Sequence, residues 1–268
     1  MLETPLGWVL LFLLGTFTGT MSGLLGIGGG LLMVPALTVF GIPLVQATAT
    51  SLVGVFLSSV SGSLRNFRAG ELNWQVSLAL ALFGIGTAQV GAWVGDRLPD
   101  AWLFLAFAAL LLITIYLMYL KAKLKKQQAK QTEAIPSEKQ KIRFSSYPRA
   151  IAGIGLLAGL LSGLFGVGGG VVMVPLQMLF LGEPIKSAVR TSLGAIVAIA
   201  ISGLIQHTLN NNVLWIPGIC LGAGGILGAQ LGTRLLPRLP DRTVNTMFRL
   251  FLIGLAVYMT IRGLRNWL

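Results

Sequence analysis

Two glycine triplets inside apolar stretches are the residues best placed to bind a ligand. They lie at 28–30 in the segment GTMSGLLGIGGGLLMVP (19–35) and at 168–170 in GLLSGLFGVGGGVVMVP (159–175). Each glycine in a helix interior costs roughly 1 kcal/mol relative to alanine, so such runs predict a break where bare backbone is needed. Helices that restart after the triplets present free N–H groups and the positive end of a dipole, which suits an anion. The alternative is that the glycines only allow helices to cross closely.

Arg190 is the most informative charged residue. The first half has Ala49 at the matching position, so this cation is peculiar to the second half. An ionisable residue near the end of a membrane helix is a functional candidate, and its natural ligand is an anion. Snorkelling of a long side chain to the membrane interface is the alternative interpretation.

Hydroxyl and amide side chains recur at matching positions in the two halves. The Thr-Ser pairs at 50–51 and 191–192 could donate hydrogen bonds to an anion, although membrane hydroxyls often bond to their own helix carbonyls. Gln89 and Gln230 lie inside apolar spans and need partners, which are each other, backbone or ligand. The predicted substrate-binding residues are Gly28, Gly29, Gly30, Gly168, Gly169, Gly170, Thr50, Ser51, Arg190, Thr191, Ser192, Gln89 and Gln230.

The remaining reactive residues argue against catalysis. The chain has one histidine and one cysteine, and all eight Asp and Glu fall at predicted helix ends, in loops or in a linker. His207 is expected in a loop. A membrane enzyme would need a nucleophile, a metal cluster or an acid–base pair, so we expect neither an enzyme nor a metal or other cofactor.

Composition places these residues in a membrane. The 268 residues are 54% hydrophobic and 10% charged, with mean hydropathy +0.81, whereas a soluble domain has about 25% charged residues. Long apolar runs without a period-two pattern predict an all-α polytopic protein in a lipid bilayer. The net charge of +12 lies mostly in loops, where the positive-inside rule explains it without a nucleic-acid partner.

The chain is a duplicated unit. Beyond the glycine segments, an offset of 141 relates the two halves; for example, 97–100 returns at 238–241. We predict a first membrane repeat (1–120), a basic cytoplasmic linker (121–148) and a second repeat (149–268), each repeat with a glycine-broken hairpin and three spanning helices. The predicted segments are 5–25, 31–41, 46–64, 73–95 and 101–120, then 149–168, 170–181, 186–206, 213–235 and 242–263.

Charge predicts that the repeats are inverted. If each hairpin returns to its own side, the second copy is flipped, and most basic loop residues join the linker in the cytoplasm. A parallel arrangement would put Lys186, Arg190, Arg234, Arg238 and Arg242 outside. Inversion leaves Arg97, Arg262 and Arg265 outside, together with both termini.

These features resemble the sulfite exporter TauE/SafE family. The resemblance rests on two G-x-G-G-G segments followed by M-V-P in a duplicated membrane chain with a basic central linker, and it extends over residues 5 to 265. It implies a permease of the bacterial-type plasma membrane that exports sulfite, sulfonates or related small organic anions. It does not specify the substrate.

The expected mechanism is alternating access with the site between the repeats. An inside-negative potential favours anion exit by about 2.3 kcal/mol per charge per 100 mV, so export needs no intramembrane carboxylate. An anion channel and an uptake permease for a sulfur-containing or carboxylate anion are the alternatives. A homo-oligomer is compatible with the sequence.

Overall fold

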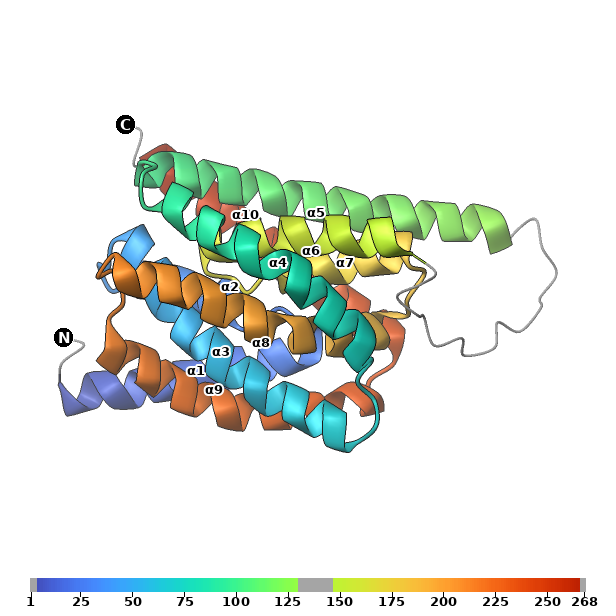
Figure 1. Ribbon diagram of the computed structural model, residues 1–268, viewed down its shortest axis with the longest axis horizontal. Helices are drawn as coiled ribbons and strands as arrows, with labels where there is room; N and C mark the ends of the chain where they lie inside the picture. The colour runs from blue at the N-terminus through green and yellow to red at the C-terminus, as the bar shows by residue number, and fades with distance from the viewer. Residues whose placement is uncertain (1–3, 130–146, 266–268) are drawn as a thin grey trace.

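The computed structural model describes residues 4–129 and 147–265, and within them every regular element is helical (Figure 1). This confirms the all-α prediction. The first half contains α1 (Pro5–Leu25), α2 (Gly30–Val39), α3 (Leu44–Arg68), α4 (Trp74–Gly95) and α5 (Asp100–Ala129). The second half contains α6 (Pro148–Phe165), α7 (Gly170–Phe180), α8 (Ile185–Leu209), α9 (Trp215–Leu235), the 3-10 turn η2 (Leu236–Arg238) and α10 (Asp241–Arg265).

Seven helices in the described part of the chain are long and apolar enough to cross a membrane: α1, α3, α4, α6, α8, α9 with η2, and α10. The short helices α2 and α7 each follow a glycine triplet, and the apolar part of α5 covers Asp100–Tyr116. A chain with this many apolar spans is a multi-pass membrane protein.

Two details differ from the sequence predictions. Helix α5 continues to Ala129, into the range predicted as linker, while residues 130–146 of that linker lie outside the described part. His207 is wrongly predicted as a loop residue, because it belongs to the last turn of α8 and is only 1% exposed. Its Nε2 lies 3.1 Å from the Gly163 carbonyl oxygen, and this contact accommodates a polar ring inside the bundle.

Backbone geometry explains why α1 and α6 stop where they do. Gly26 and Gly166 follow the last helical residues with φ of 70° and 67°, a left-handed conformation that glycine adopts without steric cost. Their N–H groups donate to the carbonyls of Ser22 and Ser162 at 2.7 and 2.8 Å, which closes the helix end. The chain then turns through the glycine loops 26–30 and 166–170.

Glycine also permits close pairing between the halves. Helix α1 packs along α9, and a Cβ added at Gly15 or Gly19 would lie 2.1 or 2.5 Å from the carbonyl oxygen of Leu221 or Gly225. From Gly15 to Gly19 on α1, the contacted residue on α9 moves from Leu221 to Gly225. Residue numbers therefore rise in the same direction on both helices, so α1 and α9 run parallel. Helices α6 and α4 pair in the same parallel way, with Gly159 against Gly84.

Helices α3 and α8 form the middle of the bundle. They are the most buried of the candidate spans and pack on each other, while α3 also packs on α9 and α8 on α4. Contacts of Thr50 with Leu214 and of Ser61 with Ile226 show that α3 runs parallel to α9. Since α8 and α9 are joined by a short turn and run in opposite directions, α3 and α8 are antiparallel.

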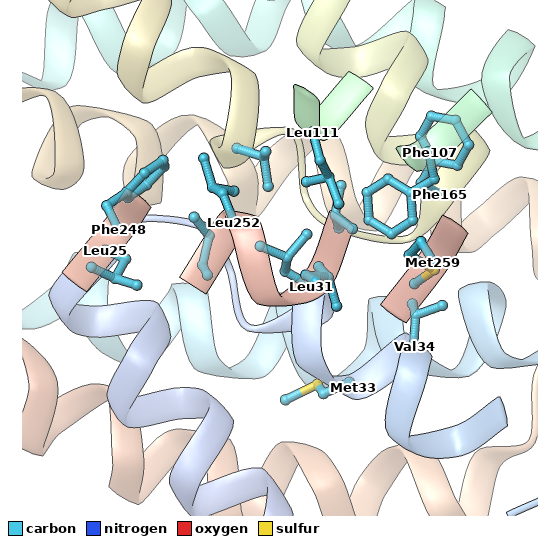
Figure 2. Packing of buried hydrophobic residues seen from close by; sticks show 14 of the residues in the cluster. Leu25, Leu31, Met33, Val34, Phe107, Leu111, Phe165, Phe248, Leu252 and Met259 are labelled. Carbon is cyan, nitrogen blue, oxygen red and sulfur yellow. The ribbon is translucent and has the colours of Figure 1, made fainter. Parts of the chain in front are cut away.

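Helices α5 and α10 pack together and cover both hairpins on one side. The Phe107 and Phe165 rings stack with centroids 4.8 Å apart. Phe248 and Leu25, at the equivalent positions of the other half, belong to the same buried cluster (Figure 2). This cluster holds the hairpins against the outer helix pair.

The chain ends define the two ends of the bundle. In Figure 1, α1 begins and α10 finishes at one end, which we call the terminal end. Helix α5 finishes and α6 begins at the opposite end, which we call the linker end.

Candidate functional site

The two glycine loops touch each other in the centre of the bundle. A Cβ at Gly30 would lie 2.1 Å from the Gly166 carbonyl oxygen, and one at Gly170 would lie 2.1 Å from that of Gly26. The N-terminus of each short helix therefore abuts the loop of the other half. The two glycine triplets thus lie in loops that contact each other, and their role in binding a substrate stays a prediction.

Serine side chains link each loop to the other half. Ser51 Oγ on α3 donates to the Gly166 carbonyl at 2.9 Å, and Ser192 Oγ on α8 donates to the Gly26 carbonyl at 2.8 Å. Each serine also contacts the carbonyl three residues earlier in its own helix. We call this reciprocal pair of bonds the serine clasp. It gives the two serines a demonstrated partner other than a ligand.

The centre is closed in this conformation. All residues of 26–30 and 166–170 are buried, and Val55 and Ile196 lie against both loops, within 3.3 Å of a Cβ added at Gly28 or Gly168. Ser58 Oγ donates to the Gly28 carbonyl at 3.1 Å, so this polar group of the loop also has a partner within the protein. An anion could reach the helix N-termini only if the two loops moved apart.

The two predicted threonines differ in their surroundings. Thr50 Oγ1 accepts a hydrogen bond from the Leu214 N–H at 3.1 Å. Thr191 is fully buried, yet its Oγ1 has no hydrogen-bond partner, while its carbonyl accepts from Ser77 Oγ at 2.8 Å. A buried hydroxyl without a partner is costly, so Thr191 is the better candidate for contact with a ligand or water.

Arg190 is bound to a carboxylate that the sequence analysis placed in a loop without a role. Its Nη2 lies 3.1 Å from Glu71 Oε1, in the connection between α3 and α4, and both side chains are partly buried. Arg190 Nε and Glu71 Oε2 have no hydrogen-bond partner. Neither simple snorkelling nor a free ligand cation describes this arrangement.

Further polar groups surround this ion pair at the linker end. Arg65 donates to the Thr233 carbonyl and lies close enough to Arg190 to interact with it electrostatically. Asn66 is fully buried with both amide groups lacking a hydrogen-bond partner, and its carbonyl accepts from the Glu71 N–H at 3.0 Å. Ser63 and Ser59, one and two turns back from Asn66 along α3, are also buried and their hydroxyls lack hydrogen-bond partners.

The two predicted glutamines do not converge on the centre. Gln230 Nε2 donates to the carbonyl and the hydroxyl of Ser61, both at 3.0 Å. Gln89 is exposed on α4. Their role as ligand residues therefore stays a prediction without support from proximity to the glycine loops.

The sequence analysis missed Ser58 and Asn66 on α3 and Gln177 on α7. Gln177 resembles Asn66, since it is fully buried and neither amide atom has a hydrogen-bond partner. A signal was present, because Ser58 and Gln177 align with Ile199 and Leu37 in the other half. Polar residues that replace an apolar residue of the repeat mark where the halves have different tasks.

The serine clasp can be tested for its contribution to stability. Ser51→Ala and Ser192→Ala should each lower the free energy of unfolding by about 1–3 kcal/mol, because a buried carbonyl of the opposite loop loses its donor. Thermal unfolding of the purified protein measures this. Ser59→Ala is the matched control, since this buried hydroxyl has no partner to lose and its removal should be neutral or stabilising. Equal stability of all three variants would contradict a structural role for the clasp.

Two broken hairpins that meet in the middle of a bundle of apolar helices define a class of protein, the polytopic membrane transporters. The sulfite exporter TauE/SafE family model matches residues 11–259, and the chain belongs to this family. The probable membrane transporter protein YunE of Bacillus subtilis is 27% identical, over 97% of this chain and 99% of that protein. A probable membrane transporter protein of Methanocaldococcus jannaschii is 26% identical over 94% and 95%.

The comparisons agree with a membrane transporter and not with an enzyme. The chain also resembles the probable membrane transporter protein MamO of Paramagnetospirillum magneticum, at 25% identity over 93% of this chain but 44% of that protein. No solved structure matches the chain.

Proposed function

We propose that this transporter exports a small anion, such as sulfite, a sulfonate or a related organic anion, across the bacterial-type plasma membrane by alternating access. The contact between the glycine loops is the observation that carries the proposal. It forms a barrier midway between the two ends, and its N–H groups become available to an anion only when the loops separate. The family's designation as sulfite exporters supports sulfite as a member of the substrate class.

Inverted repeats are part of the proposal, and helix directions support them. Helices α1 and α3 of the first half both run parallel to α9. Their counterparts in the second half, α6 and α8, both run parallel to α4. Since α4 and α9 are themselves counterparts from the two halves and run in opposite directions, each of these three helices of the first half opposes its equivalent in the second. This is the geometry with which a pseudo-two-fold axis in the membrane plane exchanges outward and inward access.

Charge supports a cytoplasmic linker end. Lys186 and Asp241 form an ion pair there at 3.5 Å, and Arg65 and Arg190 lie at the same end. Arg97 and Arg262 lie at the terminal end. The excess of basic residues at the linker end fits the positive-inside rule.

The topology has a direct test. In a Cys220→Ser background, cysteines introduced at Glu3 and at Ser137 should differ in labelling by an impermeant thiol reagent on intact cells, with only the first labelled. Disruption of the membrane should expose the second and serves as the control. Labelling of both sites on intact cells, or of neither, would reject the inverted arrangement with a cytoplasmic linker.

Transport itself is tested with the purified protein in proteoliposomes and a panel of labelled small anions. Saturable efflux that accelerates when the interior is made negative is the expected result, because each exported charge gains about 2.3 kcal/mol per 100 mV. Unitary currents would identify a channel instead. Absence of flux for every anion in the panel would reject the proposed function.

A further inference from the structure

A groove of about 430 Å³ opens between α3, α4 and α8 toward the linker end. Apolar side chains form most of its wall, including Leu64, Phe67, Leu72 and Trp74, and the hydroxyls of Ser63 and Ser77 stand at its edge. Its volume falls in the range of sites that hold small organic ligands, roughly 300–1,000 Å³. The groove lies away from the closed glycine loops, so it is a separate space.

The groove has a charged rim. Arg190, Gly194 and Ala198 are spaced by four residues and lie on one face of α8, so Arg190 is one turn beyond the groove wall. Its partner Glu71 directly precedes Leu72 of the wall. Anion recognition and apolar burial are therefore adjacent on the same three helices.

Larger side chains occupy the equivalent place in the other half. Gly194 and Ala198 correspond to Val53 and Leu57, which are larger. A Cβ added at Gly222 would lie only 2.2 Å from Leu57 Cδ1, so the leucine occupies the equivalent space. Small residues on α8 create the groove, and its presence in one half is not a by-product of the repeated fold.

The other half also lacks the charged rim. Arg190 and Glu71 correspond to Ala49 and Asn212, and Asn212 Nδ2 donates to Asp96 Oδ1 at 2.6 Å. A cation and small residues that leave space for a groove thus occur together in one half, and neither occurs at the equivalent positions of the other half. Their coincidence indicates a ligand that needs both.

We propose that this groove and its rim bind a small organic anion that carries an apolar tail, with the head at Arg190 and the tail between α3, α4 and α8. The carboxylate of Glu71 holds the position of the head when the ligand is absent, and the incoming anion displaces it. Arg190 Nε lacks a hydrogen-bond partner and is available to such a head, and Ser63, whose hydroxyl also lacks a partner, lines the groove. This inference rests on the proposed function, because it names the substrate class of the same transporter.

The groove opens on the outer surface of the bundle, since Phe67 and Trp74 of its wall are 61% and 56% exposed, so acyl chains of the bilayer compete with the solute for it. The Arg190 side chain is only 16% exposed, so an anionic head bound to it would be largely enclosed by the protein. Helices α3 and α8 also carry the serine clasp, so a tail between them lies against the elements that hold the glycine loops closed. Occupancy of the groove is thereby connected to the central barrier.

Trp74 in the groove wall provides a binding signal that does not depend on transport. In phosphatidylcholine proteoliposomes, 6-bromohexanoate should quench tryptophan fluorescence saturably. Trp74→Phe should abolish the saturable part, whereas Trp215→Phe, at the equivalent position of the other half, should leave it. Competition by acetate, butyrate and hexanoate should strengthen about fourfold per added methylene until the groove is full.

Two variants separate head from tail. Glu71→Gln should tighten 6-bromohexanoate binding about fivefold, because the competing carboxylate is gone. Ala198→Leu, which copies Leu57 of the other half, should weaken 6-bromohexanoate at least about tenfold and leave acetate competition unchanged. Thermal unfolding of each variant verifies that it is folded, and the double variant Glu71→Gln with Ala198→Leu should combine both effects.

Several results would overturn the inference. Quenching that does not saturate, or saturable quenching that Ala198→Leu leaves unchanged, would show that the apolar tail does not bind in the groove. Loss of the saturable component when phosphatidylglycerol replaces phosphatidylcholine would assign the groove to a lipid. Flux of the anion panel in the same vesicles distinguishes failure of this inference from failure of the proposed function. Flux without saturable quenching rejects only the binding of the anion in the groove. Absence of flux rejects the proposed function.

Discussion

Gly30→Ala and Gly170→Ala should each reduce anion flux by at least about tenfold. Neither glycine has a positive φ, so the effect is steric: the added methyl would lie 2.1 Å from a carbonyl oxygen of the opposite loop. That distance is far inside van der Waals contact, and relief requires the loops to separate by more than an ångström. Overpacking of this kind costs about 1–3 kcal/mol or more, and it acts on the barrier itself.

Gly29→Val and Gly169→Val should have the same outcome for a different reason. These residues have φ of 84° and 76°, which a β-branched side chain does not tolerate, and a Cβ at Gly169 would also lie 2.5 Å from the Ala158 carbonyl oxygen. The measurement is flux per molecule in proteoliposomes at matched protein content.

Gly86→Ala and Gly153→Ala are the controls for all four glycine variants. They lie in the helices α4 and α6, with open space around the added methyl, and should transport normally. Normal flux in the four loop variants would exclude the glycine contact from the transport cycle. Loss of the protein from the membrane would indicate a role in folding alone.

Arg190→Ala should raise the apparent KM for a confirmed substrate by at least about tenfold, because a charged hydrogen bond contributes about 1.5–3 kcal/mol. Arg190→Lys should have a smaller effect, since it keeps the charge but loses the planar fork that binds two oxygens of an anion. The three proteins are compared at matched membrane abundance.

The double variant Arg190→Ala with Glu71→Gln decides what the arginine does. Removing only Arg190 leaves the partly buried Glu71 carboxylate without its cation, which is itself destabilising. If the arginine serves only this ion pair, the double variant should regain the wild-type KM. If the arginine binds the anion, as we expect, the double variant should remain defective. Indistinguishable KM values in all four proteins would leave anion recognition to the helix N-termini and Thr191.

Much of the fold could be predicted because the duplication is explicit in the sequence. Glycine triplets mark the helix breaks, and the constant offset predicted that α3 and α8, or α4 and α9, would be equivalent. Partners were harder to predict. The pairing of α1 with α9 depends on glycines of both helices facing each other across some 200 positions, and neither helix carries a local signal for the other.

Less of the candidate site could be predicted. The mismatch with Ala49 in the first half identified Arg190 as unusual, but its ion pair with Glu71 depends on a loop conformation that no periodicity predicts. The Thr-Ser pairs were expected to face an anion, whereas both serines bind loop carbonyls. A hydroxyl that bonds to the protein and a hydroxyl that is free to bond to a ligand look the same in the sequence. Only the positions of the neighbouring carbonyl groups in the structure distinguish Ser192 from Thr191.

The pairing of α1 with α9 has a consequence for biogenesis. Helix α1 is synthesised long before α9, so the glycine surface of Gly15, Gly19 and Gly23 receives its neighbour only after α9 has been synthesised. Until then this surface must face lipid, a translocation factor or a provisional protein neighbour. Helix α4 waits a shorter time, because α6 follows soon after the linker. The first half therefore cannot reach its final packing during its own synthesis, and completion of the bundle is tied to insertion of the last third of the chain.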